Sequence, residues 1–183
     1  MRIDKLTTKF QEALSEAQTI ALTHDNAYIE PVHVLVAMIR EDDGPKALMH
    51  RAGVNVAGLL ATAEAAVKKL PEVKGQEQVT VGRDLVSLLQ AAEKEAIKRG
   101  DEFVAAELFL LAVCDNKGEV GNIARANGLT RKSLEAAIDA VRGGQNVDSA
   151  DAEDQRESLK KYCIDCLSYM LKRLIYILDL YFT

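Results

Sequence analysis

The feature that most restricts the fold of this chain is an internal repeat at a constant offset of 75 residues. Residues 10–67 align with residues 85–142 without a gap, and nine of the 58 aligned positions are identical. Further pairs keep their apolar character: Phe10/Leu85, Leu22/Ile97, Tyr28/Phe103, Ile29/Val104, Val34/Phe109, Leu48/Ile123 and Val54/Leu129. Repeats of this kind are supersecondary units that bury their apolar faces against each other. We therefore expect two similar halves in one domain. The alternative is two unrelated amphipathic stretches in chance register.

Each unit of the repeat has the apolar spacing of a series of helices. In the first helix, apolar residues recur three or four positions apart, which is the period of an amphipathic helix. The predicted helices span 4–23, 31–40, 45–52 and 56–69 in the first unit and 84–99, 105–114, 119–127 and 131–142 in the second. The sequence thus predicts an all-α fold within residues 1–145. Its architecture is a pseudo-twofold tandem repeat of two four-helix units, at about 4–69 and 84–142.

The turns of the two units carry the same residues for ending and starting helices. Gly53 and Gly128 lie at equivalent positions after the third helix, where a helix often ends in a left-handed residue. Asn55 and Thr130 follow two residues later and have the side chains of N-caps. A polar loop over 71–82 connects the two units. This agreement of the turns favours a true repeat over chance register.

The composition changes after Arg142 to GGQNVDSADAEDQ, which is Gly-rich and then acidic. Such composition is typical of linkers, so we expect one over residues 143–153. A helical tail is predicted over 154–183, with a very apolar second half that favours self-association or a partner helix. Attachment to a membrane surface through 159–183 is the less favoured alternative, because the chain carries little positive charge.

The overall charge argues against nucleic-acid and membrane partners. The chain has 183 residues and a formal net charge of −5, so it lacks the basic surface that such partners require. No uninterrupted apolar stretch reaches the roughly 18 residues of a membrane span, and the N-terminus lacks the apolar core of a signal peptide. The three cysteines are an odd number without the spacing of a disulfide scaffold. These features predict a cytoplasmic protein.

The residue types that carry catalysis are few and form no known motif. Neither a nucleotide-binding P-loop nor a G-x-S-x-G motif occurs in the sequence. His33 falls in a predicted buried helix, where a core or helix-end role is more common than catalysis. Cys163 and Cys166 form a C-x-x-C pair, but zinc or redox use would need a second ligand pair or a βαβ unit. The sequence therefore predicts a protein that is not an enzyme and binds no cofactor and no metal.

Three stretches resemble the Clp repeat domain at the N-terminus of ClpB-type AAA+ disaggregase chaperones. They are MRIDKLTTKFQEALSEAQTIALTHDNAYIEPVHVLVAMI, RGDEFVAAELFLLAV and RGGQNVDSADAEDQRESLKKY. The resemblance covers about residues 1–165, and both repeats, their spacing and the following segment match together. After about residue 165 the chain diverges, at the point where the family continues toward its first ATPase domain. This departure favours a truncated or a free-standing repeat protein.

The resemblance implies a non-catalytic domain that captures unfolded or aggregated polypeptide for a full-length hexameric, ATP-driven ring of the ClpB type. The polar residues associated with substrate handling in the family match Thr7, Asp101 and Glu107. Helix capping is the alternative role for all three. The groove candidates are Leu89, Ala91 and Leu108. A core position is the alternative for each of these, and Glu95 occupies a groove position that is apolar in relatives.

Two other functions remain open at this point. Relatives in ClpA and ClpC dock small adaptor proteins, so adaptor docking is one alternative. A vestigial, truncated fragment is the other. The ClpB-like segment after the repeats, together with the three polar residues, favours the capture of unfolded polypeptide.

Overall fold

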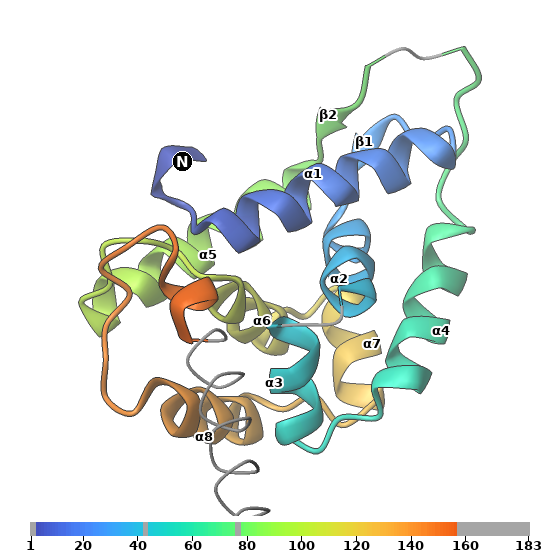
Figure 1. The fold of residues 1–183 in the computed structure, drawn as a ribbon. Coiled ribbons are helices and arrows are strands. Elements are labelled where there is room, and N and C mark those ends of the chain that lie inside the picture. The colour runs from blue at the N-terminus through green and yellow to red at the C-terminus, as the bar shows by residue number, and fades with distance from the viewer. Residues whose placement is uncertain (1–2, 42–43, 76–77, 157–183) are drawn as a thin grey trace, which may run out of the picture.

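A computed structural model describes residues 3–41, 44–75 and 78–156 (Figure 1). The predicted tail beyond residue 156, with Cys163 and Cys166, lies outside the described residues. The helices are η1 (Ile3–Lys5), α1 (Thr8–Thr23), α2 (Pro31–Arg40), α3 (Pro45–Arg51), α4 (Val56–Val67), α5 (Arg83–Arg99), α6 (Ala106–Asp115), α7 (Glu119–Ala126) and α8 (Arg131–Arg142). Two strands of two residues each, β1 (Tyr28–Ile29) and β2 (Thr80–Val81), complete the named elements. The predicted all-α class is confirmed for the described residues.

The helices of the two halves correspond at the offset of the repeat. The helices α5, α6 and α8 begin 75 positions after α1, α2 and α4, and α7 begins one residue earlier than this rule gives. Predicted helix ends agree within two residues, except that α1 begins at Thr8 and not at residue 4. Thr7 has an extended backbone, and its hydroxyl accepts a hydrogen bond from the N–H of Phe10. A cap at this position starts the helix there.

Two central helices, α2 and α6, form the middle of the core. Every residue from Val32 to Ile39 in α2 is buried, as is every residue from Ala106 to Cys114 in α6. Helices that are apolar all round are expected only where protein covers every face. The rings of Phe10 in α1 and Phe109 in α6 pack with their centroids 5.6 Å apart, which joins the first half to the second.

The two halves exchange equivalent backbone pairings. Strand β1 pairs in parallel with β2, with Ile29 opposite Val81. An isolated parallel bridge joins Leu6 to Val104. Leu6 lies 75 positions before Val81, and Ile29 lies 75 positions before Val104. Each half therefore pairs the segment before its own first helix with the turn that follows the first helix of the other half. These strands are too short to show an alternating pattern in the sequence, and none was predicted. The spatial two-fold relation between the halves stays a prediction.

The predicted turn residues have the expected conformations. Gly53 and Gly128 have φ angles of +78° and +86°, in the region that favours glycine. Asn55 and Thr130 cap α4 and α8 by accepting hydrogen bonds from backbone N–H groups three residues on. The two turns also touch, because the N–H of Asn55 donates to the carbonyl of Asn127 over 3.0 Å. The two turns therefore contribute directly to the interface between the halves.

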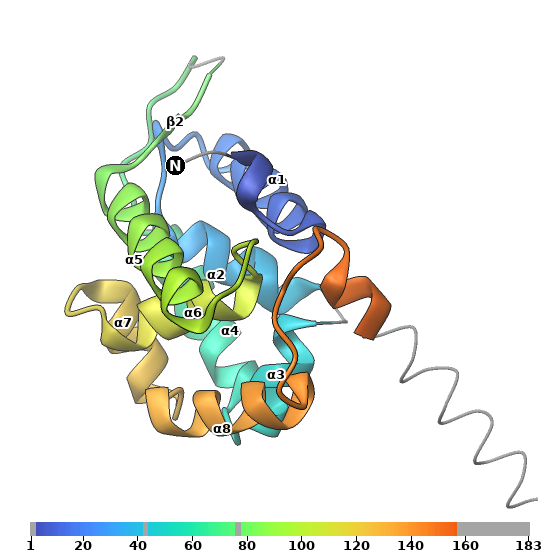
Figure 2. The same ribbon diagram turned by 90° about the vertical axis from the view of Figure 1, so that its left-hand side faces the viewer.

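Residues 144–156, the C-terminal segment, fold back from the end of α8 toward the start of α1 (Figure 2). The side chain of Val147 is fully buried, Glu153 is 7% exposed, and residues 152–156 form a helical turn. The stretch for which composition predicted a linker thus packs against the domain. Only two of its side chains are buried, so its sequence keeps a linker's polar character.

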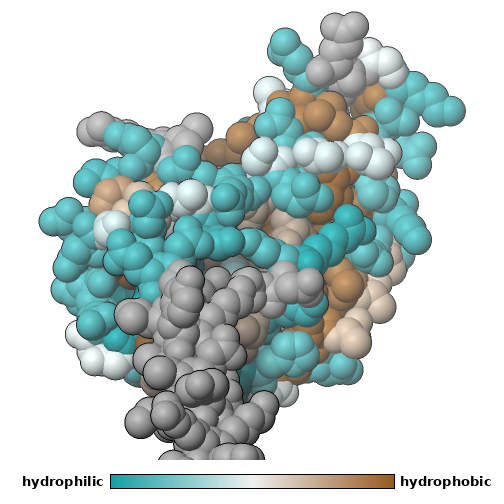
Figure 3. Space-filling view, viewed as in Figure 1, coloured by the Kyte–Doolittle hydropathy of each residue, from teal (hydrophilic) through white to brown (hydrophobic). Residues whose placement is uncertain are grey.

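Apolar surface is limited on the face seen in Figure 3. It gathers over α2, between α1 and α4, and around the end of the molecule that carries β2. The exposed large apolar side chains of the described residues are Leu22, Tyr28, Val73, Val81, Val86 and Ile97. Polar side chains cover most of the rest of this face.

Candidate functional site

The three polar residues taken from the resemblance lie where the C-terminal segment meets the domain. Thr7 precedes α1, Asp101 lies in the turn after α5, and Glu107 lies in the first turn of α6. Thr7 is fully buried, Glu107 is 8% exposed, and the side chain of Asp101 is 0% exposed. Their polar atoms therefore face other groups of this chain and not solvent.

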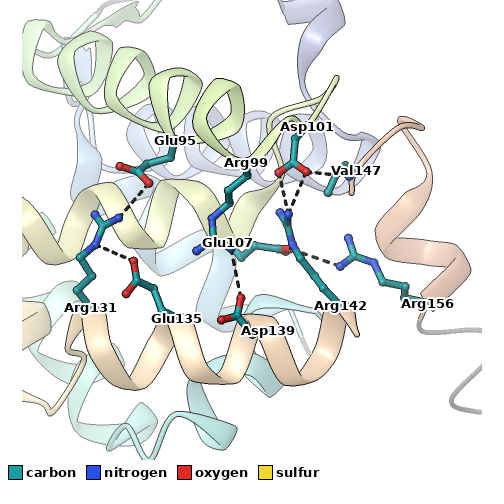
Figure 4. A network of polar contacts seen from close by, with 10 residues as sticks. All are labelled: Glu95, Arg99, Asp101, Glu107, Arg131, Glu135, Asp139, Arg142, Val147 and Arg156. Carbon is teal, nitrogen blue, oxygen red and sulfur yellow. Dashed lines mark hydrogen bonds and ion pairs between the residues drawn. The ribbon is translucent and has the colours of Figure 1, made fainter. Parts of the chain in front are cut away.

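Asp101 joins the end of α8 to the start of the C-terminal segment. Its two carboxylate oxygens accept hydrogen bonds from Nη1 of Arg142 at 3.0 and 2.8 Å (Figure 4). One of these oxygens also accepts from the backbone N–H of Val147 at 2.9 Å. The side chain of Arg142 is only 5% exposed. Charge-assisted hydrogen bonds of this kind are strong and directional.

Glu107 shares the same arginine. Its Oε1 accepts from Nε of Arg142 at 2.9 Å and lies 3.5 Å from Nη1 of Arg156. Burial acts to raise the pKa of Glu107, but the charges of Arg142 and Arg156 outweigh burial and hold that pKa below its usual value. Glu107 is therefore an anion that pairs with Arg142, which is buried, and with Arg156, which is partly buried (Figure 4).

Thr7 binds the far end of the C-terminal segment. Its hydroxyl donates to Oε2 of Glu153, and Oε1 of Glu153 accepts from the N–H of Ala106 at 3.3 Å. Burial, and then the neighbouring charge of Glu107, raise the pKa of Glu153 to about 8. The carboxyl of Glu153 therefore keeps its proton to a higher pH than an exposed glutamate does. The predicted site residues Thr7, Asp101 and Glu107 are brought together, but what they hold is the chain's own segment.

A series of ion pairs continues this network along α8. Arg131 pairs with Glu95 of α5 at 2.9 Å, and Arg99 pairs with Asp139 at 3.4 Å (Figure 4). Burial acts to raise the pKa of Glu95, but hydrogen bonds from Lys98 and Arg131 outweigh it and lower that pKa. Glu95 therefore anchors α8 to α5 through Arg131.

The apolar groove candidates have different environments. Leu89 is 8% exposed and Leu108 is 0% exposed, so both side chains belong to the core. Ala91 is only partly buried and lines a shallow hollow of about 320 Å³ between α5 and α6. Of the three candidates, Ala91 alone faces a space that a ligand could enter.

This hollow has a counterpart in the first half, of about 390 Å³, between α1 and α2. The first hollow is lined by Glu12, Ala13, Glu16, Ala37, Arg40 and Glu41. The second is lined by Ser87, Leu88, Ala91, Glu95, Ala112, Asp115, Asn116 and Lys117. Every residue of the first list has its counterpart, 75 positions on, in the second. The two halves therefore present equivalent hollows, each with small apolar side chains and with charged neighbours of both signs.

Histidine, cysteine and acidic side chains elsewhere in the described part of the chain have structural surroundings. Among those residues, no group of three or more His, Cys, Asp and Glu side chains could hold a metal ion. Burial raises the pKa of the Cys114 thiol to about 11, and burial lowers the pKa of His33 to about 4. His33 accepts a hydrogen bond from the N–H of Glu30 and contacts Asn26, so it is the core and helix-end residue that was predicted. No helix of residues 3–41, 44–75 and 78–156 has the length and apolar character needed to cross a membrane.

The comparison with protein families is decisive for this architecture. The model of the Clp repeat (R) N-terminal domain matches residues 5–127, which cover the first half and the second half as far as α7. The chain belongs to the Clp repeat family. It is 43% identical over 163 residues to the chaperone protein ClpB of Dichelobacter nodosus, covering 88% of this chain and 19% of that protein. It is 39% identical over 167 residues to ClpB of Vibrio cholerae, covering 90% of this chain and 20% of that protein. This Clp repeat chain thus spans about a fifth of the length of these relatives.

Solved structures of other Clp N-terminal domains share the fold. The Hsp104 N-terminal domain of Candida albicans superimposes with a TM-score of 0.70 at 21% identity, over 81% of this chain and 99% of that one. A ClpV N-domain in complex with a VipB peptide has a TM-score of 0.65 at 18% identity, over 82% of this chain and 91% of that one. At these identities the likeness shows the fold, and the second structure is that of an N-domain of the same fold in complex with a peptide.

Sequence reasoning missed the partners of the predicted polar residues in this Clp repeat domain. Arg142, Val147, Glu153 and Arg156 complete the network, and the last three lie in or after the predicted linker. The available signal was an apolar residue and a glutamate within a Gly-rich, acidic stretch. That signal is weak, because neither residue has a periodic neighbour.

Proposed function

We propose that this Clp repeat chain is a non-catalytic polypeptide-binding domain of a ClpB-like chaperone. It captures unfolded or aggregated protein for an ATP-driven disaggregase. The pair of equivalent hollows is the observation that supports this function. Shallow sites with small apolar side chains bind apolar residues of many sequences weakly, which suits clients without fixed geometry.

The charge around the hollows is mixed. Glu12, Glu16, Arg40 and Glu41 line the first hollow, and Glu95, Asp115 and Lys117 line the second. Glu41 already pairs with Lys9, and Glu95 and Asp115 with Arg131, so the small apolar side chains are what a client would bind. Two weak sites on one domain also let a single extended client bind at both, which raises the overall affinity.

The test is a titration of the full chain with a permanently unfolded, labelled protein, followed by NMR shift changes. We expect the shifts to gather at Ala13, Ala37, Ala91 and Ala112. The variant Ala91→Lys fills the second hollow and should weaken binding by about threefold or more, since one of two cooperating sites is lost. Ala140→Lys, on an exposed position of α8, is the matched control and should leave binding unchanged. Shifts that avoid both hollows would contradict the proposal.

Adaptor docking is the second candidate function, and the ClpV N-domain that holds a VipB peptide is the observation that favours it. An adaptor would bind as a folded partner with fixed stoichiometry, and the unfolded client would not compete with it. Client capture requires unfolded polypeptide as the partner, a hexameric ClpB-type ring to receive the client, and a cytoplasmic location. The chain's acidic charge fits neither nucleic acid nor an anionic membrane as a partner.

A further inference from the structure

The C-terminal segment is held by backbone hydrogen bonds of the kind that hold an extended peptide ligand. The carbonyl of Val147 accepts from the N–H groups of Glu102 and Phe103 at 3.0 and 3.1 Å. The carbonyl of Ala150 accepts from the N–H of Thr8 at 2.9 Å. Backbone hydrogen bonds give affinity without requiring a particular sequence, and side-chain pockets add selectivity.

Two side chains anchor the same stretch. Val147 is fully buried, and its N–H donates to Asp101. Six positions later, the carboxyl of Glu153 accepts from Thr7 and from the N–H of Ala106, the first residue of α6. The positive end of a helix dipole and its unpaired N–H groups favour an acceptor of this kind. An apolar anchor and a carboxyl anchor thus define a slot on the domain.

Comparison of the two halves shows that the start of α6 obtains its carboxyl acceptor from the C-terminal segment. In the first half, Glu30 is the N-cap of α2 and forms a capping box with His33. The equivalent residue in the second half, 75 positions on, is Ala105, which has no side chain to cap α6. Glu153 supplies that acceptor from 47 positions beyond Ala106. When the segment leaves, the start of α6 is open to a carboxyl or amide oxygen from another chain.

We propose that residues 147–153 are an internal ligand of this slot, and that an extended stretch of client polypeptide replaces them there. The matching client carries an apolar residue followed six positions later by Glu or Gln. The client part of this inference rests on the proposed function, whereas the internal-ligand part does not. Replacement of the segment is also what brings Thr7 and Asp101, buried behind it, into contact with a client.

The test uses the full chain with two variants that weaken the segment. Val147→Asp places a charge in the apolar anchor position, and Glu153→Ala removes the carboxyl. Asp148→Asn, at an exposed position of the same segment, is the matched control. The probes are a fluorescent peptide of residues 145–156 and the labelled unfolded client. Circular dichroism and thermal unfolding establish that each variant is folded.

Both probes should bind the Val147→Asp and Glu153→Ala chains at least about tenfold more tightly than the wild type, because a competing internal ligand lowers apparent affinity. The control should bind like the wild type. Peptide binding without client binding would support the internal ligand and contradict the proposed function. Failure of the peptide to bind either folded variant would overturn the inference.

Amide exchange of the wild-type chain tests the inference even where the variants do not fold. The N–H groups of Thr8, Glu102 and Phe103 donate to the segment, so they should exchange together and faster than the N–H groups of α2 and α6. Exchange of these three amides only by global unfolding would show that the segment never leaves by itself. That result would also overturn the inference.

Discussion

Asp101 accepts hydrogen bonds from the guanidinium of Arg142 through both of its carboxylate oxygens. The two residues lie 41 positions apart in the chain, and both side chains are almost fully buried. Glu107 accepts from the same guanidinium. The turn after α5, the start of α6 and the end of α8 therefore share one buried cation. Removing that cation leaves two carboxylates without their main partner in a place of low polarity.

We expect Arg142→Ala to lower the free energy of unfolding by about 3–5 kcal/mol, since breaking a buried pair leaves uncompensated charge. Urea unfolding followed by circular dichroism measures this change. Arg40→Ala is the control, because Arg40 pairs with Glu64 while both side chains are well exposed. The control should change stability by about 1 kcal/mol or less. Equal effects of the two substitutions would contradict the prediction.

The position of Gly121 in α7 leaves no room for a side chain. A Cβ atom there would lie 1.9 Å from the carbonyl oxygen of Asn116. Gly121→Ala should therefore destabilise the domain by about 1–3 kcal/mol, as overpacking does, although alanine is the better helix former. Asn122→Ala, the exposed next residue, should change stability by about 0.5 kcal/mol or less. Thermal unfolding of the two variants compares them directly.

The lowered pKa of His33 predicts that the free energy of unfolding decreases as the pH falls. Its folded pKa is lowered from 6.5 to about 4, so between these values the unfolded chain binds more protons than the folded one. The stability that it contributes is present above pH 6.5 and is lost as the pH falls toward 4. His33→Gln should flatten the dependence of the unfolding free energy on pH in this window. A slope equal to that of the wild type would count against this role.

The raised pKa of Glu153 predicts that the C-terminal segment is held less firmly as the pH rises. Its folded pKa is raised from 4.5 to about 8 by burial and by Glu107, with Arg156 acting against them. Its contribution is therefore complete below pH 4.5 and is lost as the pH rises through 8. The amides of Glu102 and Phe103, corrected for intrinsic exchange rates, should lose protection between pH 4.5 and 8. Glu153→Gln, which carries no titrating proton, should keep that protection constant.

The sequence was sufficient for the repeat, the helices and the turns, because these depend on local chemistry. Gly53 has its left-handed backbone and Asn55 its cap for reasons that lie within a few residues of each. Helix α1 began later than predicted, because apolar spacing continues through Leu6 whereas the cap at Thr7 decides the start. Periodicity does not contain that distinction.

The candidate site was only partly accessible to sequence reasoning, for a physical reason. Leu108 and Ala91 are both apolar residues on helices, and only the packing of other helices decides that the first is core and the second lines a hollow. The burial of Glu153 depends on Thr7, 146 positions away, and on Ala106. No local pattern around Glu153 encodes partners at such separations.

The backbone pairings between the two halves determine when the domain can complete its fold during synthesis. Leu6 pairs with Val104, so the first strand-like segment to be made waits for a partner about 100 residues later. At synthesis rates of about 5–20 residues per second, that interval is roughly 5–20 s. Until α6 is made, the apolar surface of the first half that α6 covers, including the ring of Phe10, lacks this partner. A nascent Clp repeat domain is thus itself, for several seconds, an exposed apolar chain of the kind that chaperones bind.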